Sequence, residues 1–402
     1  MHTQVAVIGG GIGGLGAALS LLRTGLDVHV YEQAHALREV GAGIQVSPNA
    51  SRVLHGLGLG DRLAKLGVRP FAFHVRRWDD GRTLVKTPLG DTVIEAFGFP
   101  HYQSHRADVL AMLINALPAE RLHIGHRLIS FTDRGDRVET TFENGERITA
   151  DILVGADGIH STVRRLLFGA ASPNFTGCIC YRGLIPTERI KHLDVEVDAQ
   201  RWMGPGKHII IYYVAAKRLL NFVGTIEQDT WTGESWTDRG DVKELRAAFI
   251  DWDPHLRAII ETIDETFIWG LFDRAPLSRW SVGRVTLLGD ACHPMLPFMA
   301  QGAAQALEDG LSLTVCLTTI DDVPTALSHY EKIRLPRTSR IQTMSAANKT
   351  RFHLADGPAQ QERDAKMADG STDYSVRAIA WVYSYDAATA VKTGDLGLPA
   401  NM

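Results

Sequence analysis

The chain of 402 residues has 45% hydrophobic residues, 22% charged residues and a formal net charge of −4, which is typical of a folded protein with two or three domains. This charge offers no basic surface for DNA or RNA, and the lack of a run of about 18 apolar residues argues against a membrane span. The four cysteines have neither a CxxC pair nor a metal-ligand spacing, so we expect no metal site and a location in the reducing cytoplasm.

The chain begins with the pattern of a strand, a glycine-rich turn and a helix. The strand-like QVAVI at 4–8 leads directly into Gly9, Gly11 and Gly14, which are spaced as G-x-G-x-x-G, and an apolar helix pattern follows. Such glycines allow a tight turn, a close approach of phosphate to the backbone and close packing of helix on strand. The N–H groups at the helix N-terminus attract phosphate. We therefore predict that this turn, with Gly13 inside it, binds the pyrophosphate of a dinucleotide.

A second strand pattern, LDVHVYE at 26–32, ends on an acidic residue. The Glu32 carboxylate can accept hydrogen bonds from the ribose hydroxyls of an adenosine, and we assign the neighbouring Gln33 to the same site. A glycine-rich turn that binds no ligand is the alternative. The motif alone does not choose between NAD and FAD, because both contain the same ADP half.

Four later segments indicate the identity of the cofactor: GAGIQ at 41–45, SHRADVLAML at 104–113, ILVGADGIHSTVRR at 152–165 and LLGDACHPMLPFMAQGAAQALEDG at 287–310. Taken singly, their residues have structural explanations. Arg106 would be a solvated residue at a helix start, Asp157 part of a strand-to-helix turn, and Asp290 a helix cap at the end of a strand. Leu128, within the strand pattern IGHRLISF, would belong to a core strand.

Together with the glycine turn and Glu32, these segments resemble the single-component FAD-dependent aromatic hydroxylases, which include salicylate, 3-hydroxybenzoate and 6-hydroxynicotinate monooxygenases. The resemblance spans about residues 3–350. It implies that FAD is the bound cofactor and that Gln45, Arg106, Leu128, Asp157, Asp290, Gly302 and Ala303 take part in binding it. Gly302 and Ala303 begin a helix, whose positive end would face the pyrimidine edge of the flavin.

The resemblance also implies an activity. NADH or NADPH would act as a transient electron donor, and O2 would form a C4a-hydroperoxyflavin that hydroxylates a small phenolic or N-heteroaromatic substrate. A hydroxylated aromatic carboxylate of the 6-hydroxynicotinate, salicylate or hydroxybenzoate type is expected, with or without loss of its carboxylate. The alternatives are an FAD-dependent oxidase or dehydrogenase on the same fold, and a non-enzymatic FAD-binding protein. We expect a monomer or a homodimer.

The middle of the chain changes to antiparallel strand signals. In KHIIIYYV, alternation places His208, Ile210 and Tyr212 on one face of a strand. In the resembling enzymes the matching positions bind and deprotonate a phenol, and a base with a pKa near 7 suits that role, so we expect His208 and Tyr212 to be catalytic. The alternative is a core tyrosine with His208 at the sheet edge. Besides His208 and Tyr212, His293 and water are the candidates for the group that accepts the proton.

The substrate pocket is expected to contain His208, Ile210, Tyr212, Pro297 and Phe298. The hydroxynicotinate enzymes have histidines where this chain has Gln45 and Phe298, so we expect a more apolar pocket here.

The predicted fold class is α/β: a Rossmann-like, three-layer FAD-binding domain with a mostly parallel sheet, an inserted antiparallel-sheet substrate domain and a C-terminal helical segment. The FAD-binding domain is predicted to comprise 1–70, 99–175 and 265–345. The substrate domain is predicted to comprise 71–98 and 176–264, and the helical segment 346–402.

Overall fold

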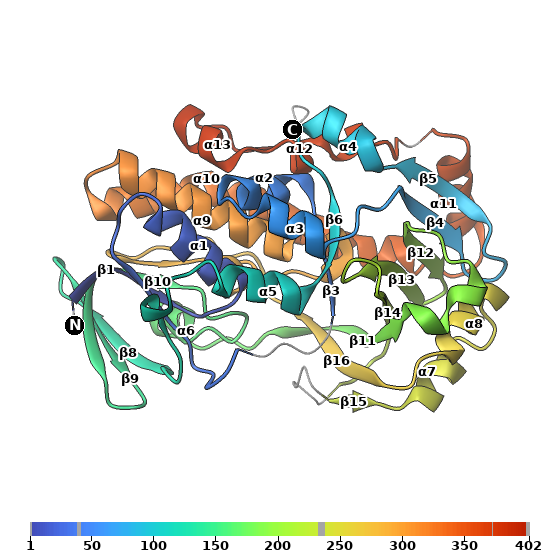
Figure 1. The fold of residues 1–402 in the computed structure, drawn as a ribbon, viewed down its shortest axis with the longest axis horizontal. Coiled ribbons are helices and arrows are strands. Elements are labelled where there is room, and N and C mark those ends of the chain that lie inside the picture. Colours follow the sequence, from blue (N-terminus) through green and yellow to red (C-terminus); the bar gives the residue numbers. More distant parts are fainter. Residues whose placement is uncertain (1, 38–41, 232–237, 372, 399–402) are drawn as a thin grey trace.

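The computed structural model describes residues 2–37, 42–231, 238–371 and 373–398, and it contains the mostly parallel sheet that the sequence predicts (Figure 1). The strand order is β7-β2-β1-β10-β9-β8, and β17 also pairs with β10. All pairs are parallel except β10 with β9 and β9 with β8. The strands are β1 (His2–Ile8), β2 (Val28–Tyr31), β7 (Leu122–His123), β8 (Leu128–Asp133), β9 (Val138–Phe142), β10 (Arg147–Gly155) and β17 (Val285–Leu287).

The second half of the central strand β1, residues 5–8, is buried on both faces, which is why its sequence is a continuous apolar run instead of an alternating one. Helix α1 (Ile12–Leu22) packs against α9 (Gly302–Thr319), and α9 packs in turn against α10 (Val323–Phe352). Small residues allow the close approach of α1 and α9: a Cβ on Gly310 would lie 2.8 Å from the Cα of Ala17. This packing fixes the N-terminus of α9 beside the glycine turn.

An eight-stranded second sheet lies beside the first, in the order β15-β16-β11-β14-β13-β12-β4-β5, and only its β12–β4 pair is parallel. Its strands are β4 (Ala72–Arg77), β5 (Thr83–Pro88), β11 (Asn174–Pro186), β12 (Ala199–Gly204), β13 (Lys207–Val214), β14 (Leu219–Glu227), β15 (Arg239–Gly240) and β16 (Thr266–Asp273). Its back face packs on α7 (Val242–Ala248) and α8 (Pro254–Glu261), where Ile209 and Ile211 are buried. The opposite face therefore carries His208, Ile210 and Tyr212, as the alternation predicts.

One predicted boundary is wrong. The predicted FAD-binding domain resumes at residue 265, but β16 belongs to the antiparallel sheet. Its partner is β11, in a register that places Cys180 opposite Trp269 and Tyr181 opposite Ile268. The hydrogen bonds between β16 and β11 assign residues 266–273 to the antiparallel sheet. The periodicity of these eight residues does not predict that pairing.

The predicted start of a separate C-terminal segment at 346 falls inside α10, which continues without a break to Phe352. Beyond it, α11 (Pro358–Ala368), α12 (Ala380–Tyr383) and α13 (Ala387–Thr393) follow. Phe352 and Met367 pack on Val75 and Met203 of the antiparallel sheet. The end of α10 therefore lies against the face of the sheet that carries His208.

The remaining elements connect the two sheets. A small antiparallel pair is formed by β3 (Gly43–Val46) and β6 (Tyr102–His105), and β6 contacts β13. The other helices are α2 (Pro48–Gly56), α3 (Gly60–Leu66), α4 (Gly90–Phe97), α5 (Arg106–Ile114) and α6 (Thr162–Phe168). Within the described residues, none of the helices has both the length and the apolar character needed to cross a bilayer.

Candidate active site

Two cavities meet at the glycine turn. The larger one, of about 330 Å³, extends between the N-terminus of α9 and the antiparallel sheet, and the smaller one, of about 200 Å³, extends toward the end of β2. Both are lined by Gly11, Ala156 and Gly158. They form one elongated groove with the glycine turn near its middle.

The glycines of the turn have different surroundings. Gly9 has a φ of +114°, and a Cβ there would lie 2.3 Å from the carbonyl oxygen of Ala156. A Cβ on Gly14 would lie 2.0 Å from the carbonyl oxygen of Gly9, and one on Gly13 would lie 2.9 Å from the Cβ of Ala306. A Cβ on Gly11 would meet no protein atom within 4 Å, because Gly11 faces the groove. Gly9 and Gly14 thus serve the packing, and Gly11 leaves room for a ligand.

The smaller cavity contains four of the residues predicted for the adenosine end, namely Glu32, Gln33, Leu128 and Asp157. The Glu32 carboxylate accepts hydrogen bonds from the N–H groups of Gly10 at 2.7 Å and Ala34 at 2.8 Å, which hold it at the cavity wall. The sequence reasoning missed His126 and Arg127, which line the same cavity. Their signal was weak, because a histidine and an arginine before a strand are usually solvated.

Asp157 lines the cavity, but its carboxylate has a structural partner. It accepts hydrogen bonds from the N–H groups of Thr162 at 2.7 Å and Val163 at 3.1 Å, and from the hydroxyl of Ser161. These bonds satisfy N–H groups at the start of α6. The geometry therefore supports the alternative in which the Asp157 side chain stabilises the strand-to-helix turn. The residue itself still lines the smaller cavity.

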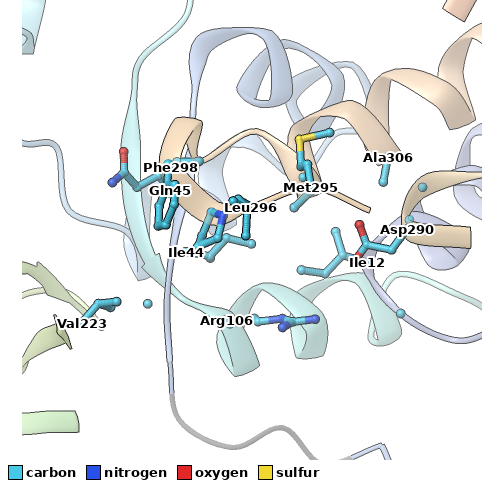
Figure 2. A pocket seen from close by; sticks show the side chains of 18 of the residues that line it. Ile12, Ile44, Gln45, Arg106, Val223, Asp290, Met295, Leu296, Phe298 and Ala306 are labelled. Carbon is cyan, nitrogen blue, oxygen red and sulfur yellow. The ribbon is translucent and has the colours of Figure 1, made fainter. Parts of the chain in front are cut away.

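The larger cavity contains the residues predicted for the flavin end, namely Gln45, Arg106, Asp290, Gly302 and Ala303. Figure 2 shows Asp290, Arg106 and Ile12 toward one end of this cavity and Gln45, Phe298 and Val223 toward the other. Gly302 and Ala303 begin α9, whose N-terminus has no side-chain cap, so its first N–H groups are available to a ligand. Asp290 faces the cavity, and desolvation raises the pKa of its carboxyl, although the charges of His293 and Arg106 partly oppose this effect.

The Asp290 loop is held by a buried carboxylate. Asp309 of α9 accepts hydrogen bonds from the N–H of Gly289 at 3.0 Å and from Nε2 of His293 at 2.6 Å, and it pairs with Nε of Arg334 at 2.7 Å. His293 is thereby engaged with α9 and does not line the cavity. This position removes it as the alternative base.

These residues fit an FAD. The groove offers an acid at one end, a side-chain-free turn in the middle, and a helix N-terminus with an arginine at the other end, in the order adenosine, pyrophosphate and isoalloxazine. Two further glycine-rich stretches, the hairpin turn at Gly206 and the helix boundary at Gly58, do not line either cavity.

The antiparallel sheet closes the larger cavity with the face that carries His208. His208, Ile210 and Tyr212 of β13 line it, and so do Pro297 and Phe298 from the loop before α9, so all five predicted pocket residues meet there. β13 lies between β12 and β14, which excludes the alternative of His208 at a sheet edge. Opposite Tyr212, a Cβ on Gly43 would lie 2.6 Å from the tyrosine hydroxyl, so only glycine fits at that position of β3.

The expectation of a base with a pKa near 7 is wrong for His208. Burial, together with the charges of His353 and Arg201, lowers its pKa well below the usual value, so the imidazole is neutral at physiological pH. Burial raises the pKa of Tyr212, and the charge of Arg182 only partly opposes this effect. The cavity therefore contains a neutral imidazole as acceptor and a protonated phenol as donor.

The sequence reasoning missed two further residues near the cavity. Arg182 of β11 lines it, and its guanidinium carbon lies 3.7 Å from the ring centroid of Trp269. His353, at the end of α10, places Nε2 2.6 Å from Nδ1 of His208. A charged residue on the inward face of a predicted strand was a usable signal for Arg182. No local pattern marks His353, since it lies far from His208 along the chain.

The geometry agrees with comparisons to known proteins. A family model described as an FAD binding domain matches residues 2–345. The chain is 40% identical over 388 residues to the 3-amino-4-hydroxybenzoate 2-monooxygenase PtmB3 of Streptomyces platensis, covering 96% of each protein. It is 38% identical over 350 residues to the 6-hydroxynicotinate 3-monooxygenase of Bordetella bronchiseptica, covering 86% of this chain and 91% of that protein.

Its structure superposes on that of Klebsiella pneumoniae HpxO complexed with FAD and uric acid, with a TM-score of 0.84, 26% identity and 98% of each chain covered. These matches extend over nearly the whole length of the chain, so they include both sheets and the cavity between them. The chain belongs to the family of FAD-dependent aromatic monooxygenases.

Proposed function

We propose that this monooxygenase hydroxylates a one-ring phenol that carries a carboxylate, with Arg182 binding the carboxylate and His208 accepting the phenolic proton. The observation that carries this proposal is the surroundings of Arg182. Its guanidinium lines the cavity, its buried Nε has no hydrogen-bond partner, and among the described residues no carboxylate pairs with it. An arginine in such a place is suited to an anionic ligand.

Three features favour an anion near Arg182. Trp269 stacks on the guanidinium and leaves its hydrogen-bonding edges for a planar carboxylate. Burial and the positive charge of Arg106 both lower the pKa of Arg182, and an anion would relieve both effects. Arg182, His208 and Tyr212 line one cavity, so one ring could contact all three through its carboxylate and its hydroxyl.

The chain's own residues prepare the substrate. A phenol reacts with electrophilic oxygen more readily once it is ionised, so a neutral His208 that accepts its proton would activate the ring. The Tyr212 hydroxyl stays protonated and can donate a hydrogen bond to the resulting oxyanion. When bound, FAD supplies the redox chemistry that inserts one oxygen atom of O2 into the ring, using electrons from NADH or NADPH.

We favour a hydroxybenzoate or aminohydroxybenzoate over a hydroxynicotinate. Gln45 and Phe298 stand where the hydroxynicotinate enzymes have histidines, and Phe298 gives that part of the wall an apolar ring. The 40% identical relative is named for 3-amino-4-hydroxybenzoate, which carries the amino, hydroxyl and carboxylate groups that Tyr212, His208 and Arg182 could bind.

The test is a panel of substrates with the purified holoenzyme: 3-amino-4-hydroxybenzoate, 3-hydroxybenzoate, salicylate and 6-hydroxynicotinate. NADH and NADPH consumption is measured with each substrate, and the product is analysed after reaction under ¹⁸O2. Stimulated consumption with a labelled hydroxylated product supports the proposal and identifies the electron donor. Formation of H2O2 with an unlabelled, dehydrogenated product would support the oxidase alternative.

We also propose a cytoplasmic location, because all four cysteines are buried free thiols, which suits a reducing compartment. Cell fractionation tests this. A monomer or a homodimer is proposed as the oligomeric state, and light scattering of the holoenzyme distinguishes the two.

A further inference from the structure

A chain of hydrogen bonds leads from His208 to the protein surface. Nδ1 of His208 lies 2.6 Å from Nε2 of His353, and Nδ1 of His353 lies 3.0 Å from Oε1 of Glu227. His208 and His353 are buried, whereas 43% of the Glu227 side chain is exposed. The chain therefore begins at the cavity wall and ends in solvent.

The carboxylate at the outer end fixes the tautomers of both imidazoles. An ionised carboxylate only accepts hydrogen bonds, so Nδ1 of His353 must carry the proton that faces Glu227. Nε2 of a neutral His353 is then an acceptor, and Nδ1 of His208 must carry the proton between the two rings. Nε2 of a neutral His208 is left unprotonated, and it has no hydrogen-bond partner within the part of the chain that the structure describes. The order of bonds thus makes this nitrogen a base.

We propose that His353 and Glu227 are positioning residues that form a proton relay with His208 and carry the proton of the substrate hydroxyl out of the closed cavity to the surface. This inference rests on the role proposed above for His208 as the base. It assigns a function to two residues that lie outside the cavity wall.

Each step of the relay moves one proton and needs no other reactant. The O–H bond of the substrate breaks and an N–H bond forms at Nε2 of His208. The proton on Nδ1 of His208 moves to Nε2 of His353, and the proton on Nδ1 of His353 moves to the carboxylate of Glu227, which exchanges it with water. Reversal of the same steps returns a proton to the product and restores both tautomers.

The surroundings of the two histidines favour transfer over storage of the proton. Arg201 of β12 places a positive charge near His208, and Lys349 of α10 places one near His353. Burial lowers the pKa of both imidazoles most, and the two charges lower them further, whereas Glu227 opposes this only at His353. The rings of Phe298 and Phe352 pack on His208 with centroids at 5.0 and 5.3 Å. A proton accepted by His208 is therefore driven outward to Glu227.

The backbone holds the outer two members of the relay together. Gly206, in the turn between β12 and β13, donates its N–H to the carbonyl of His353 at 3.0 Å. The carbonyl of the same glycine accepts the N–H of Glu227 at 2.8 Å. One turn thus fixes the end of α10 and the end of β14 in register, although no local sequence motif links them.

The kinetic test uses holoenzyme variants His353→Gln and Glu227→Gln with 3-amino-4-hydroxybenzoate between pH 6 and pH 9. General-base catalysis contributes about 10²- to 10⁴-fold, so we expect His353→Gln to lower kcat by about 100-fold at pH 7 and Glu227→Gln by about tenfold. KM and the FAD content, read from the flavin absorbance, should stay within about twofold, since neither residue lines the cavity. Because hydroxide replaces the lost acceptor, the variants should recover part of kcat as the pH rises.

Two control variants separate the relay from general damage. Asp229→Asn removes a carboxylate two residues after Glu227, and His329→Gln replaces a histidine in α10 far from the cavity; both should behave as the wild type. A kcat for His353→Gln equal to that of the wild type across the pH range would overturn the relay. An equal loss in Asp229→Asn and Glu227→Gln would also overturn it.

A second measurement tests the relay without turnover. It therefore distinguishes a wrong relay from a wrong choice of substrate. Nitrogen NMR of the ¹⁵N-histidine-labelled holoenzyme, with the His208 signals assigned through His208→Gln, reports the tautomer directly. The relay requires a proton on Nδ1 and none on Nε2 of His208, and a mixture of tautomers in Glu227→Gln. A wild-type His208 protonated at Nε2 would contradict the relay whatever the substrate.

Discussion

Two pairs of arginines in different regions of the molecule have opposite surroundings. Between α9 and α10, Arg334 pairs with Glu308 at 2.6 Å and Asp309 at 2.7 Å, and Arg337 pairs with Glu308 at 2.9 Å. In the antiparallel sheet, Arg182 and Arg201 stack on aromatic rings, and within the described residues no carboxylate forms an ion pair with either. The compensated charges of Arg334 and Arg337 hold two helices together, whereas an uncompensated charge at a cavity, such as that of Arg182, is suited to binding a ligand.

The two pairs of arginines also differ in what they contribute, since one pair serves the stability of the fold and the other the function of the site. The charges between α9 and α10 hold the loop that carries Asp290, so they act on the site only by keeping the scaffold in place. The sheet arginines contribute little to folding, because desolvation without a partner opposes burial of their charge. Substitutions in the two regions should therefore affect different measurements.

The largest expected effect on stability is that of Asp309→Asn. It leaves Arg334 without one carboxylate, loosens His293 and leaves the loop at Gly289 with a weaker acceptor, so we expect the free energy of unfolding to fall by about 3–5 kcal/mol. Urea unfolding followed by far-UV circular dichroism measures this change. The exposed Asp136→Asn is the control and should change stability by less than about 0.5 kcal/mol. An unchanged midpoint for Asp309→Asn would refute the scaffold role.

The same network predicts a response to acid. Desolvation raises the pKa of both carboxyls, but attraction by Arg337 and Arg334 at Glu308, and by His293 and Arg334 at Asp309, outweighs it and lowers both pKa values in the folded state. A carboxyl with a depressed folded pKa stabilises the protein above its unfolded pKa, about 4 for these groups, and this contribution is lost as the pH falls through the folded value. Unfolding free energy should therefore decline below about pH 4 in the wild type and less steeply in Asp309→Asn.

The expected effect of Arg182→Met is on substrate binding. Loss of a hydrogen bond to a charged group costs about 1.5–3 kcal/mol, so kcat/KM for 3-amino-4-hydroxybenzoate should fall by about 10- to 100-fold. With 2-aminophenol, which lacks the carboxylate, the variant and the wild type should be similar. The free energy of unfolding should stay equal or rise, because methionine removes an uncompensated charge.

Arg201→Met is the matched control, since Arg201 is also uncompensated but does not line the cavity. It should leave the preference for the carboxylate unchanged, although it removes a charge that lowers the pKa of His208. A preference for 3-amino-4-hydroxybenzoate over 2-aminophenol that survives in Arg182→Met would place the carboxylate elsewhere in the cavity.

The contrast between the regions also explains what could be predicted from the sequence. The glycine turn was predictable because its requirement is local: a Cβ on Gly14 would collide with the backbone of Gly9, five residues earlier. The inward face of β13 was predictable from alternation alone. The partners of Arg182 and His353 depend on which strands and helices meet, and no periodicity contains that information. The misplaced boundary at 265 has the same origin, because only pairing with β11 assigns β16 to its sheet.

The smallest expected effect is that of Tyr212→Phe. A single neutral hydrogen bond contributes about 0.5–1.5 kcal/mol, which corresponds to a loss of about 2- to 12-fold in kcat. Because burial raises the pKa of Tyr212, its hydroxyl stays a donor up to high pH, and the substitution should lower kcat without changing the shape of the profile between pH 6 and pH 9. His353→Gln should change that shape, so the two variants separate stabilisation of the phenolate from removal of its proton. A Tyr212→Phe profile that shifts as the His353→Gln profile does would instead place the tyrosine in the path of the proton.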